Sequence, residues 1–256
     1  TIADLKDMQE KLVESEKMAG MIGLVSGVAH EMNTPFGVVI TALSQTEDNI
    51  SKFLELLKEK KLTKKTLDKF EQSSLLSFEV INRNMEKAVN LIDSFKSLSP
   101  QMPKEDIHTF SLHEPIQYVV LANKELLEKG NIDITLNINE DIQITSYSHM
   151  ISDVFHQLIQ NSIIHAFENS DNNKISISTT QTKNFIIIKY QDNGQGIPVE
   201  NKEKIFEPFY TTKRNTNCTG LGMSILYNRV VHQLKGEIEY DLAKERGVNI
   251  TIKLPV

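Results

Sequence analysis

The stretch HEMNTP, residues 30–35, places a histidine, a carboxylate, a hydroxyl and a proline within six positions. A neutral imidazole is a good nucleophile, and its pKa lies naturally near physiological pH. At helical spacing, Glu31 can accept the proton on the second ring nitrogen of His30, and Thr34 lies one turn along the same face. Pro35 has no N–H, so the carbonyl of Glu31 loses its helical partner. We therefore expect a reactive histidine on a helix that bends beside it.

The residues around this motif follow a seven-residue apolar repeat. One register contains Ile22, Ala29, Phe36, Leu43, Ile50 and Leu57, and the other contains Val25, Met32, Val39 and Phe53, with Thr46 in the gap. A repeat sustained over several heptads predicts a helix in a bundle or a coiled coil. Because Ala29 and Met32 occupy the two seam positions, His30 is predicted to lie on an outward face.

A second heptad pattern follows after the polar stretch KEKKLTKK, residues 58–65, which is short enough for a hairpin between antiparallel helices. Its two registers are Leu67, Ile81, Ala88 and Phe95, and Phe78, Met85 and Ile92. Two helices cannot cover both faces of such a seam, so we expect two chains to pair into a dimeric four-helix bundle. Residues 1–98 are thus predicted to form an all-α dimerisation domain, and residues 99–108, with two prolines, a linker.

From residue 109 onward, apolar residues alternate with polar ones over short runs. The segments 131–139, 174–180 and 247–255 alternate, whereas 184–190 is nearly continuously apolar. Helical patterns lie around 113–129, 149–168 and 221–234. This order predicts an α+β sandwich over residues 109–256, in which helices pack on one face of a mixed sheet.

Four clusters occur in this half in a fixed order. Asn161 and His165 lie one turn apart on a predicted helix, DNGQGIP (192–198) follows the most apolar strand, EKIFEPFYTTK follows it, and TGLGMSI (219–225) opens a helix. Each cluster alone is weak, because an Asp-x-Gly-x-Gly stretch is more often an ordinary turn. An aromatic group such as Phe206, Phe209 and Tyr210 is equally typical of plain core packing.

Together and in this order, the clusters resemble the Bergerat ATP-binding fold of histidine kinases, gyrase-type topoisomerases and mismatch-repair ATPases, over roughly residues 110–256. The resemblance implies that ATP and Mg²⁺ are the cofactors. Asn161 would ligate Mg²⁺ through its amide oxygen, which is a hard ligand suited to that ion. Asp192 would accept a hydrogen bond from the adenine amino group.

The same resemblance implies a larger set of nucleotide-binding residues. Gly194 and Gly196 would let the backbone turn tightly beside the nucleotide, with Ile197 following them and His165 nearby. Backbone N–H groups at a helix N-terminus would face the phosphates, and two cations would neutralise their charge. These residues are Gly220, Leu221, Gly222 and Met223 for the amides and Lys213 and Arg214 for the cations. Residues 194–222 would form a lid.

The sequence departs from the family pattern at two positions. Gln157 stands where many members have a first asparagine, and Cys218 replaces the first glycine of a Gly-x-Gly-x-Gly run. The second change restricts the lid slightly and leaves the phosphate-binding amides in place.

The stretch HEMNTPF resembles the phosphoacceptor box of the histidine-kinase dimerisation domain, and the preceding residues 15–31 extend the likeness. The resemblance implies that His30 is phosphorylated from ATP and passes the group to an aspartate of a response-regulator receiver domain. Glu31 would tune the histidine, and Thr34 would orient water for dephosphorylation of the regulator. Two alternatives stay open: another class of ATPase with this fold, and a non-enzymatic dimeric scaffold.

The bulk composition indicates which partners and which cellular compartment suit this chain. A net charge of −6 argues against a nucleic-acid-binding surface, and a single cysteine suits a reducing cytoplasm. The apolar runs are only a few residues long, which is too short to cross a bilayer. Because the chain begins at Thr1, we expect any membrane anchor or sensor to lie in a missing upstream portion.

Overall fold

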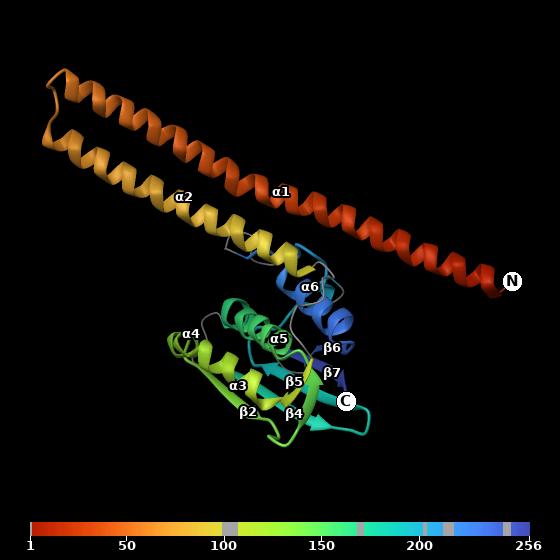
Figure 1. Ribbon diagram of the computed structural model, residues 1–256. Coiled ribbons are helices and arrows are strands. Elements are labelled where there is room, and N and C mark those ends of the chain that lie inside the picture. The colour runs from red at the N-terminus through yellow and green to blue at the C-terminus, as the bar shows by residue number, and fades with distance from the viewer. Residues whose placement is uncertain (1, 99–106, 168–171, 202–203, 212–217, 243–246) are drawn as a thin grey trace. The chain divides into compact units, whose positions relative to one another are not determined.

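The computed structural model describes residues 2–98, 107–167, 172–201, 204–211, 218–242 and 247–256. The chain divides into two compact units, residues 1–96 and 97–256 (Figure 1). Among the described residues, no helix combines the length and apolar character needed to cross a membrane.

The first unit is an antiparallel helical hairpin, as the heptad patterns predict. Helix α1 spans Ile2–Lys58 and helix α2 spans Lys64–Leu98. The turn between them ends in a reciprocal cap: the Thr66 N–H donates to Thr63 Oγ1 over 3.2 Å, and the Thr63 N–H donates to Thr66 Oγ1 over 2.9 Å. Near this turn, the rings of Phe53 and Phe70 stack with centroids 4.3 Å apart and fix the register of the hairpin.

The predicted seam of α1 is divided between two environments. Val39 and Thr46 of one register are buried, and so are Ala88 and Leu91 of α2. The other register is largely open: Leu43 is 50% exposed. The other large exposed residues of this α1 register are Phe36, Ile50 and Leu57. Val25, from the register of Val39, is also exposed, as are Leu67, Phe78, Met85 and Phe95 from the two registers of α2. The side chain of Ile22 lies outside the described part.

Pro35 is buried inside α1, and the helix continues through it without ending. Proline in a helix interior removes one backbone hydrogen bond, so tertiary packing must hold the helix together on either side. The antiparallel partner α2 supplies that packing, since Val28 and Val39 flank Pro35 as buried residues.

The second unit is built on a five-stranded mixed sheet with the order β2-β4-β5-β7-β6. The strands are β2 (Ile132–Asn137), β4 (Asn173–Gln181), β5 (Phe185–Asp192), β7 (Val248–Pro255) and β6 (Glu237–Leu242). Strands β2 and β4 pair in parallel, and the other neighbours pair antiparallel. A separate two-stranded sheet pairs β1 (His108–Ser111) with β3 (Gln143–Ser146).

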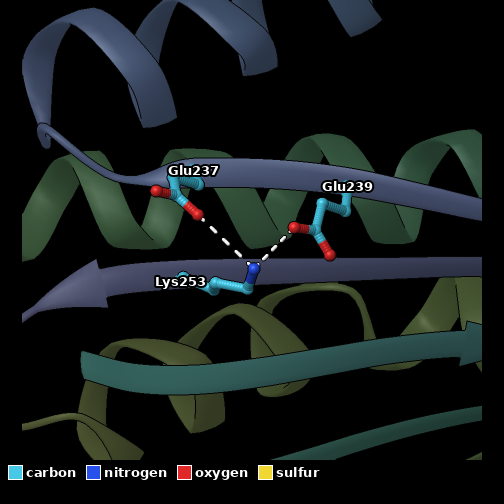
Figure 2. A network of polar contacts seen from close by, with 3 residues as sticks. All are labelled: Glu237, Glu239 and Lys253. Atoms are coloured by element: carbon cyan, nitrogen blue, oxygen red, sulfur yellow. Dashed lines mark hydrogen bonds and ion pairs between the residues drawn. The ribbon is translucent and has the colours of Figure 1, made fainter.

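Alternation along the strands sends one set of side chains into the core. Ile186, Ile188 and Tyr190 of β5 and Ile250 and Ile252 of β7 are almost completely buried. The opposite set is polar. There, Lys253 of β7 lies between Glu237 and Glu239 of β6, with Nζ to carboxylate distances of 3.4 and 2.5 Å (Figure 2). The sheet therefore has one apolar face for helices and one polar face, which is typical of a two-layer sandwich.

Helices α3 (His113–Ala122), α4 (Lys124–Lys129), α5 (Ser148–Asn161) and α6 (Gly222–Tyr227) contribute the apolar residues that complete this core. Two π-helical segments continue them: Ser162–Ala166 after α5 and Asn228–Gln233 after α6. The sequence predicts the α+β sandwich correctly. It does not separate α3 from α4, and strands β1, β3 and β6 go unpredicted.

Candidate functional site

Asp192 is a buried carboxylate of the second unit that is held by several hydrogen bonds. It ends β5, is 8% exposed, and accepts three hydrogen bonds from the protein. Its Oδ1 accepts from the N–H groups of Gly194 (3.0 Å) and Val248 (3.1 Å), and its Oδ2 accepts from Ser162 Oγ (2.7 Å). Burial raises the pKa of Asp192, and these three hydrogen bonds oppose that rise.

Ser162 and Tyr190 form a second layer behind this carboxylate. The hydroxyl of Tyr190 lies 2.7 Å from Ser162 Oγ and 3.1 Å from the carbonyl oxygen of Leu158, and its one proton can be donated to either acceptor. Tyr190 is 1% exposed, and burial raises its pKa further above its usual range, with the nearby Asp192 charge adding to the effect. The phenol therefore remains neutral at physiological pH.

Gly194 and Gly196 follow Asp192 at positions where another residue would clash with neighbouring backbone or strain its own. A Cβ on Gly194 would overlap Ala166, with the Ala166 carbonyl oxygen only 2.6 Å away. Gly196 has φ +74°, a left-handed conformation that disfavours other residues. Between them, the Gln195 N–H donates to the Ala166 carbonyl over 2.9 Å and its side chain donates to the His165 carbonyl over 2.6 Å. The turn is thus fastened to the π-helical end of α5.

Asn161 lies at the last position of α5, one turn from Gln157. The Gln157 Nε2 donates to Asn161 Oδ1 over 3.0 Å, and Asn161 Nδ2 donates to Met223 Sδ over 3.1 Å. A Cβ on Gly222 would overlap the Gln157 amide. The structure therefore brings Asn161, Gly222 and Met223 together, as the motif order predicts, with Gln157 among them.

The start of α6 is shaped by two residues with left-handed backbones. Gly220 has φ +69° and Phe209 has φ +66°, and a Cβ on Gly220 would lie 2.5 Å from the Phe209 carbonyl carbon. Leu221 is fully buried, and its N–H donates to Thr219 Oγ1 over 3.3 Å. Lys213 and Arg214, predicted to neutralise phosphate charge, lie outside the described residues.

His165 and Ile197, the remaining predicted nucleotide contacts, come from the π-helical segment after α5 and from the residue that follows Gly196. His165 is half-buried in the π-helical segment, and Ile197 packs against the apolar core. Their positions beside Gly194 and Gly196 agree with the predicted neighbourhood, since the His165 carbonyl contacts Gln195 directly.

The donor atoms at this site suit a hard divalent cation held jointly with a ligand. Among the described residues, no group of three or more His, Cys, Asp or Glu side chains gathers in a way that could hold a metal ion by itself. The Asn161 amide oxygen is a suitable single ligand for Mg²⁺, which normally keeps several waters and substrate oxygens. The residues present therefore fit Mg²⁺ as a companion of a phosphorylated ligand.

The predicted acceptor histidine lies in the first unit, on α1. His30, Glu31 and Thr34 are all exposed, which agrees with the outward face predicted from the heptads. Thr34 Oγ1 reaches the His30 carbonyl at 3.5 Å, one helical turn back. The imidazole is thus presented on a helix surface and is not buried in the hairpin.

Several residues of the site go unpredicted by the sequence. Ser162 and Tyr190 look like ordinary helix and strand residues, and their contact with Asp192 depends on the packing of α5 against β5. Gly247, with φ +122°, passes directly against the Asp192 carbonyl, and the Val248 N–H follows it. The glycine that precedes an alternating strand was the signal that could have located this approach.

A buried carboxylate and a glycine turn thus lie beside an asparagine at the end of a helix, on a mixed two-layer sandwich. Residues 149–256 match the family described as histidine kinase-, DNA gyrase B-, and HSP90-like ATPase. The chain thus combines a helical hairpin with a sandwich of this ATPase family.

Comparison with individual proteins shows which members of this ATPase family the chain resembles. The catalytic domain of histidine kinase ThkA is 33% identical, with a TM-score of 0.53, over 59% of this chain and 96% of that one. Sporulation kinase B of Bacillus subtilis is 26% identical over 257 residues, covering 100% of this chain and 54% of that protein. The chain belongs to the histidine kinase family.

Longer structural matches show the fold across both units. A crystal structure of ThkA in complex with the response regulator protein TrrA aligns with 97% of this chain and 66% of that one at 24% identity, with a TM-score of 0.62. The chain spans about half the length or less of the curated relatives it matches, for example 31% of sporulation kinase E of Bacillus subtilis.

Proposed function

We propose that this chain is the catalytic core of a sensor histidine kinase, which uses ATP and Mg²⁺ to phosphorylate His30. The observation that carries the proposal is the site around Asp192: a buried acceptor-only carboxylate, fixed by three hydrogen bonds, beside Asn161 and a glycine turn. We propose the division 1–98 for dimerisation and phosphoacceptor, 99–108 for linker and 109–256 for nucleotide binding.

The nucleotide would be held by groups from both sides of the glycine turn. Asp192 would accept from the adenine amino group, and Asn161 would hold Mg²⁺ through its amide oxygen. Mg²⁺ would supply neutralisation of phosphate charge. The backbone N–H groups of residues 220–223 would face the phosphates, with Lys213 and Arg214 as the proposed cations.

The chemical step would form a bond between a His30 ring nitrogen and the γ-phosphorus while the bond from that phosphorus to the bridging oxygen breaks and ADP leaves. Glu31 would accept the proton from the other ring nitrogen and so keep the attacking nitrogen's lone pair available. An exposed His30 supports this role because two different partners must reach it in turn.

A response-regulator receiver domain would then accept the phosphoryl group on an aspartate, and Thr34 would position water for its later removal. We propose that the working form is a homodimer, supported by the open register on the hairpin that includes Leu43 and Ile50. We place this portion of the protein in the cytoplasm. The regulator named in the ThkA complex belongs to that protein, and it supports a receiver domain here as a class of partner.

Incubation with γ-labelled ATP tests the proposal. The chain should acquire label that is acid-labile and base-stable, as a phosphohistidine is. His30→Gln should remove the label, whereas His113→Gln, at the start of α3, should retain it. Labelling that persists in His30→Gln would overturn the assigned acceptor. Absence of label in the wild type, with ATP still bound, would favour the non-enzymatic scaffold.

A further inference from the structure

Most of the hydrogen-bond acceptor positions of the Asp192 carboxylate are occupied by donors from the protein itself. An ionised carboxylate offers about four lone-pair positions, two on each oxygen. The Gly194 and Val248 N–H groups occupy both positions of Oδ1, and Ser162 Oγ occupies one position of Oδ2. One acceptor position remains, on Oδ2, and the Ser162 hydroxyl decides where it points.

The Ser162 hydroxyl is itself oriented by Tyr190. Since the serine proton is donated to Asp192, the 2.7 Å contact between the Ser162 and Tyr190 oxygens must be made by the single Tyr190 proton, for which the Leu158 carbonyl at 3.1 Å is the longer, competing acceptor. Both residues are buried, so water does not compete for these bonds. A chain of hydrogen bonds in a low-dielectric interior polarises its members and strengthens each bond.

From this arrangement we infer that Ser162, supported by Tyr190, is a positioning residue that keeps Asp192 an ionised, correctly aimed acceptor and thereby selects a purine with an amino group at C6. The inference rests on the proposed function and deepens it. A carboxylate that only accepts bonds a 6-amino group and repels the carbonyl of a 6-oxo purine. If Asp192 held a proton, it could donate to that carbonyl, and the discrimination would fall.

The other titratable groups around Asp192 do not compete for this role. The phenols of Tyr190 on β5 and Tyr240 on β6 face it, and burial raises the pKa of both, so both stay neutral. His165 lies on the same π-helical segment as Ser162, and among the described residues no cation contributes to the raised pKa of Asp192. Ser162 is thus the side chain that opposes the effect of burial on this carboxylate.

The test measures equilibrium binding of ATP and of inosine triphosphate, which has a carbonyl at C6, to the full chain with Mg²⁺ between pH 5 and 8. Three variants are compared with the wild type. Ser162→Ala removes the donor to Oδ2, Tyr190→Phe removes only the support behind it, and Ser176→Ala removes a serine hydroxyl from the polar face of the neighbouring strand β4.

In Ser162→Ala, ATP binding near pH 7.5 should weaken about tenfold, because a hydrogen bond to a charged group is lost. Loss of ATP binding on acidification should begin at higher pH than in the wild type, and the preference for ATP over inosine triphosphate should narrow as the pH falls. Tyr190→Phe should show the same changes to a smaller degree, since Ser162 still reaches Asp192. Ser176→Ala should behave as the wild type.

A merely structural role for Ser162 would weaken both nucleotides equally and leave the pH profile in place. That result, or ATP binding within twofold of the wild type at every pH, would overturn the inference while the proposed function stands. If the wild-type chain failed to bind ATP, the proposed function itself would fail. Thermal unfolding of each variant separates loss of fold from loss of the acceptor.

Discussion

The Gln157 side chain donates its amide hydrogen to the Asn161 amide oxygen over 3.0 Å, so the proposed Mg²⁺ ligand already has a partner within the helix. A Cβ on Gly222 would lie 2.4 Å from the Gln157 Nε2, so the same amide packs against the start of α6. Gln157 therefore connects Asn161, the proposed Mg²⁺ ligand, with the glycine turn proposed to bind the phosphates.

This relationship predicts a rescue. Gly222→Ala should push the Gln157 amide aside and weaken binding of ATP with Mg²⁺ several-fold, and Gln157→Ala in the same chain should restore most of that loss because the obstructing atoms are gone. Calorimetric titration of the single and double variants measures the coupling. Two independent, additive losses would contradict the contact.

Gly220→Ala is the matched control for that experiment. Gly220 has φ +69°, and its added Cβ would meet the Phe209 backbone, which cannot swing away like a side chain. Strain of this kind costs about 1–3 kcal/mol. Gly220→Ala should weaken binding whether or not Gln157 is present, so rescue by Gln157→Ala would show that both glycines act through general loosening of the turn.

Asp192→Asn should separate stability from binding. Burial raises the pKa of Asp192 above its ordinary value of 3.8, so its favourable contribution to stability is complete below that value and is lost as the pH rises through the raised pKa. Asparagine carries no charge to bury, and its amide oxygen can still accept from Gly194 and Val248. The variant should unfold at higher urea concentration than the wild type at pH 7.5. This difference in stability between the variant and the wild type should become smaller on acidification. It should also lose ATP binding.

A variant that is less stable than the wild type at pH 7.5, or whose difference does not change with pH, would show that the three hydrogen bonds outweigh the cost of burying the charge. Ser176→Ala, on the polar face of β4, provides the reference for an ordinary substitution in the same sheet.

The order of motifs predicts which segments come together around Asp192, but it does not predict the packing behind that carboxylate. Asp192, Gly196 and Asn161 stand in recognisable local patterns, and the backbone angles and contacts of the structure agree with them. Ser162 reaches Asp192 across a sequence separation of 30 residues, and only the docking of α5 on β5 creates that bond. Periodicity likewise predicts the two helices of the hairpin, but it could not predict which apolar register the chain covers by itself.

The two registers of α1 should respond differently to a charge. Leu43 is 50% exposed in the single chain, whereas Val39 is 8% exposed against α2. Leu43→Glu should therefore leave the hairpin folded and reduce the mass measured by light scattering from a dimer to a monomer. Val39→Glu buries an unpaired carboxylate, which is costly, and should lower the unfolding temperature of the hairpin.

Lys52→Glu, at an exposed polar position of α1, is the control for charge alone. If Leu43→Glu retained the dimer mass at micromolar concentration, the open register would not be the surface that pairs.

Substitutions of Glu31 and Thr34, on one turn of α1, should affect two different activities: phosphorylation of His30 and dephosphorylation of the receiver domain. Glu31→Ala removes the proposed acceptor for the His30 proton. General-base contributions are on the order of 10²–10⁴-fold, so the rate of histidine labelling should fall steeply while ATP binding stays near normal. Thr34→Ala removes a hydroxyl whose protein partner is the His30 carbonyl at 3.5 Å, a long bond that contributes little to the helix. Labelling should stay within a few-fold, and dephosphorylation of a phosphorylated receiver domain should slow. Thr34→Ser keeps the hydroxyl and should retain both rates. If Thr34 instead serves mainly to support the helix around Pro35, both rates should drop together in Thr34→Ala, and equal losses would exclude the division of labour.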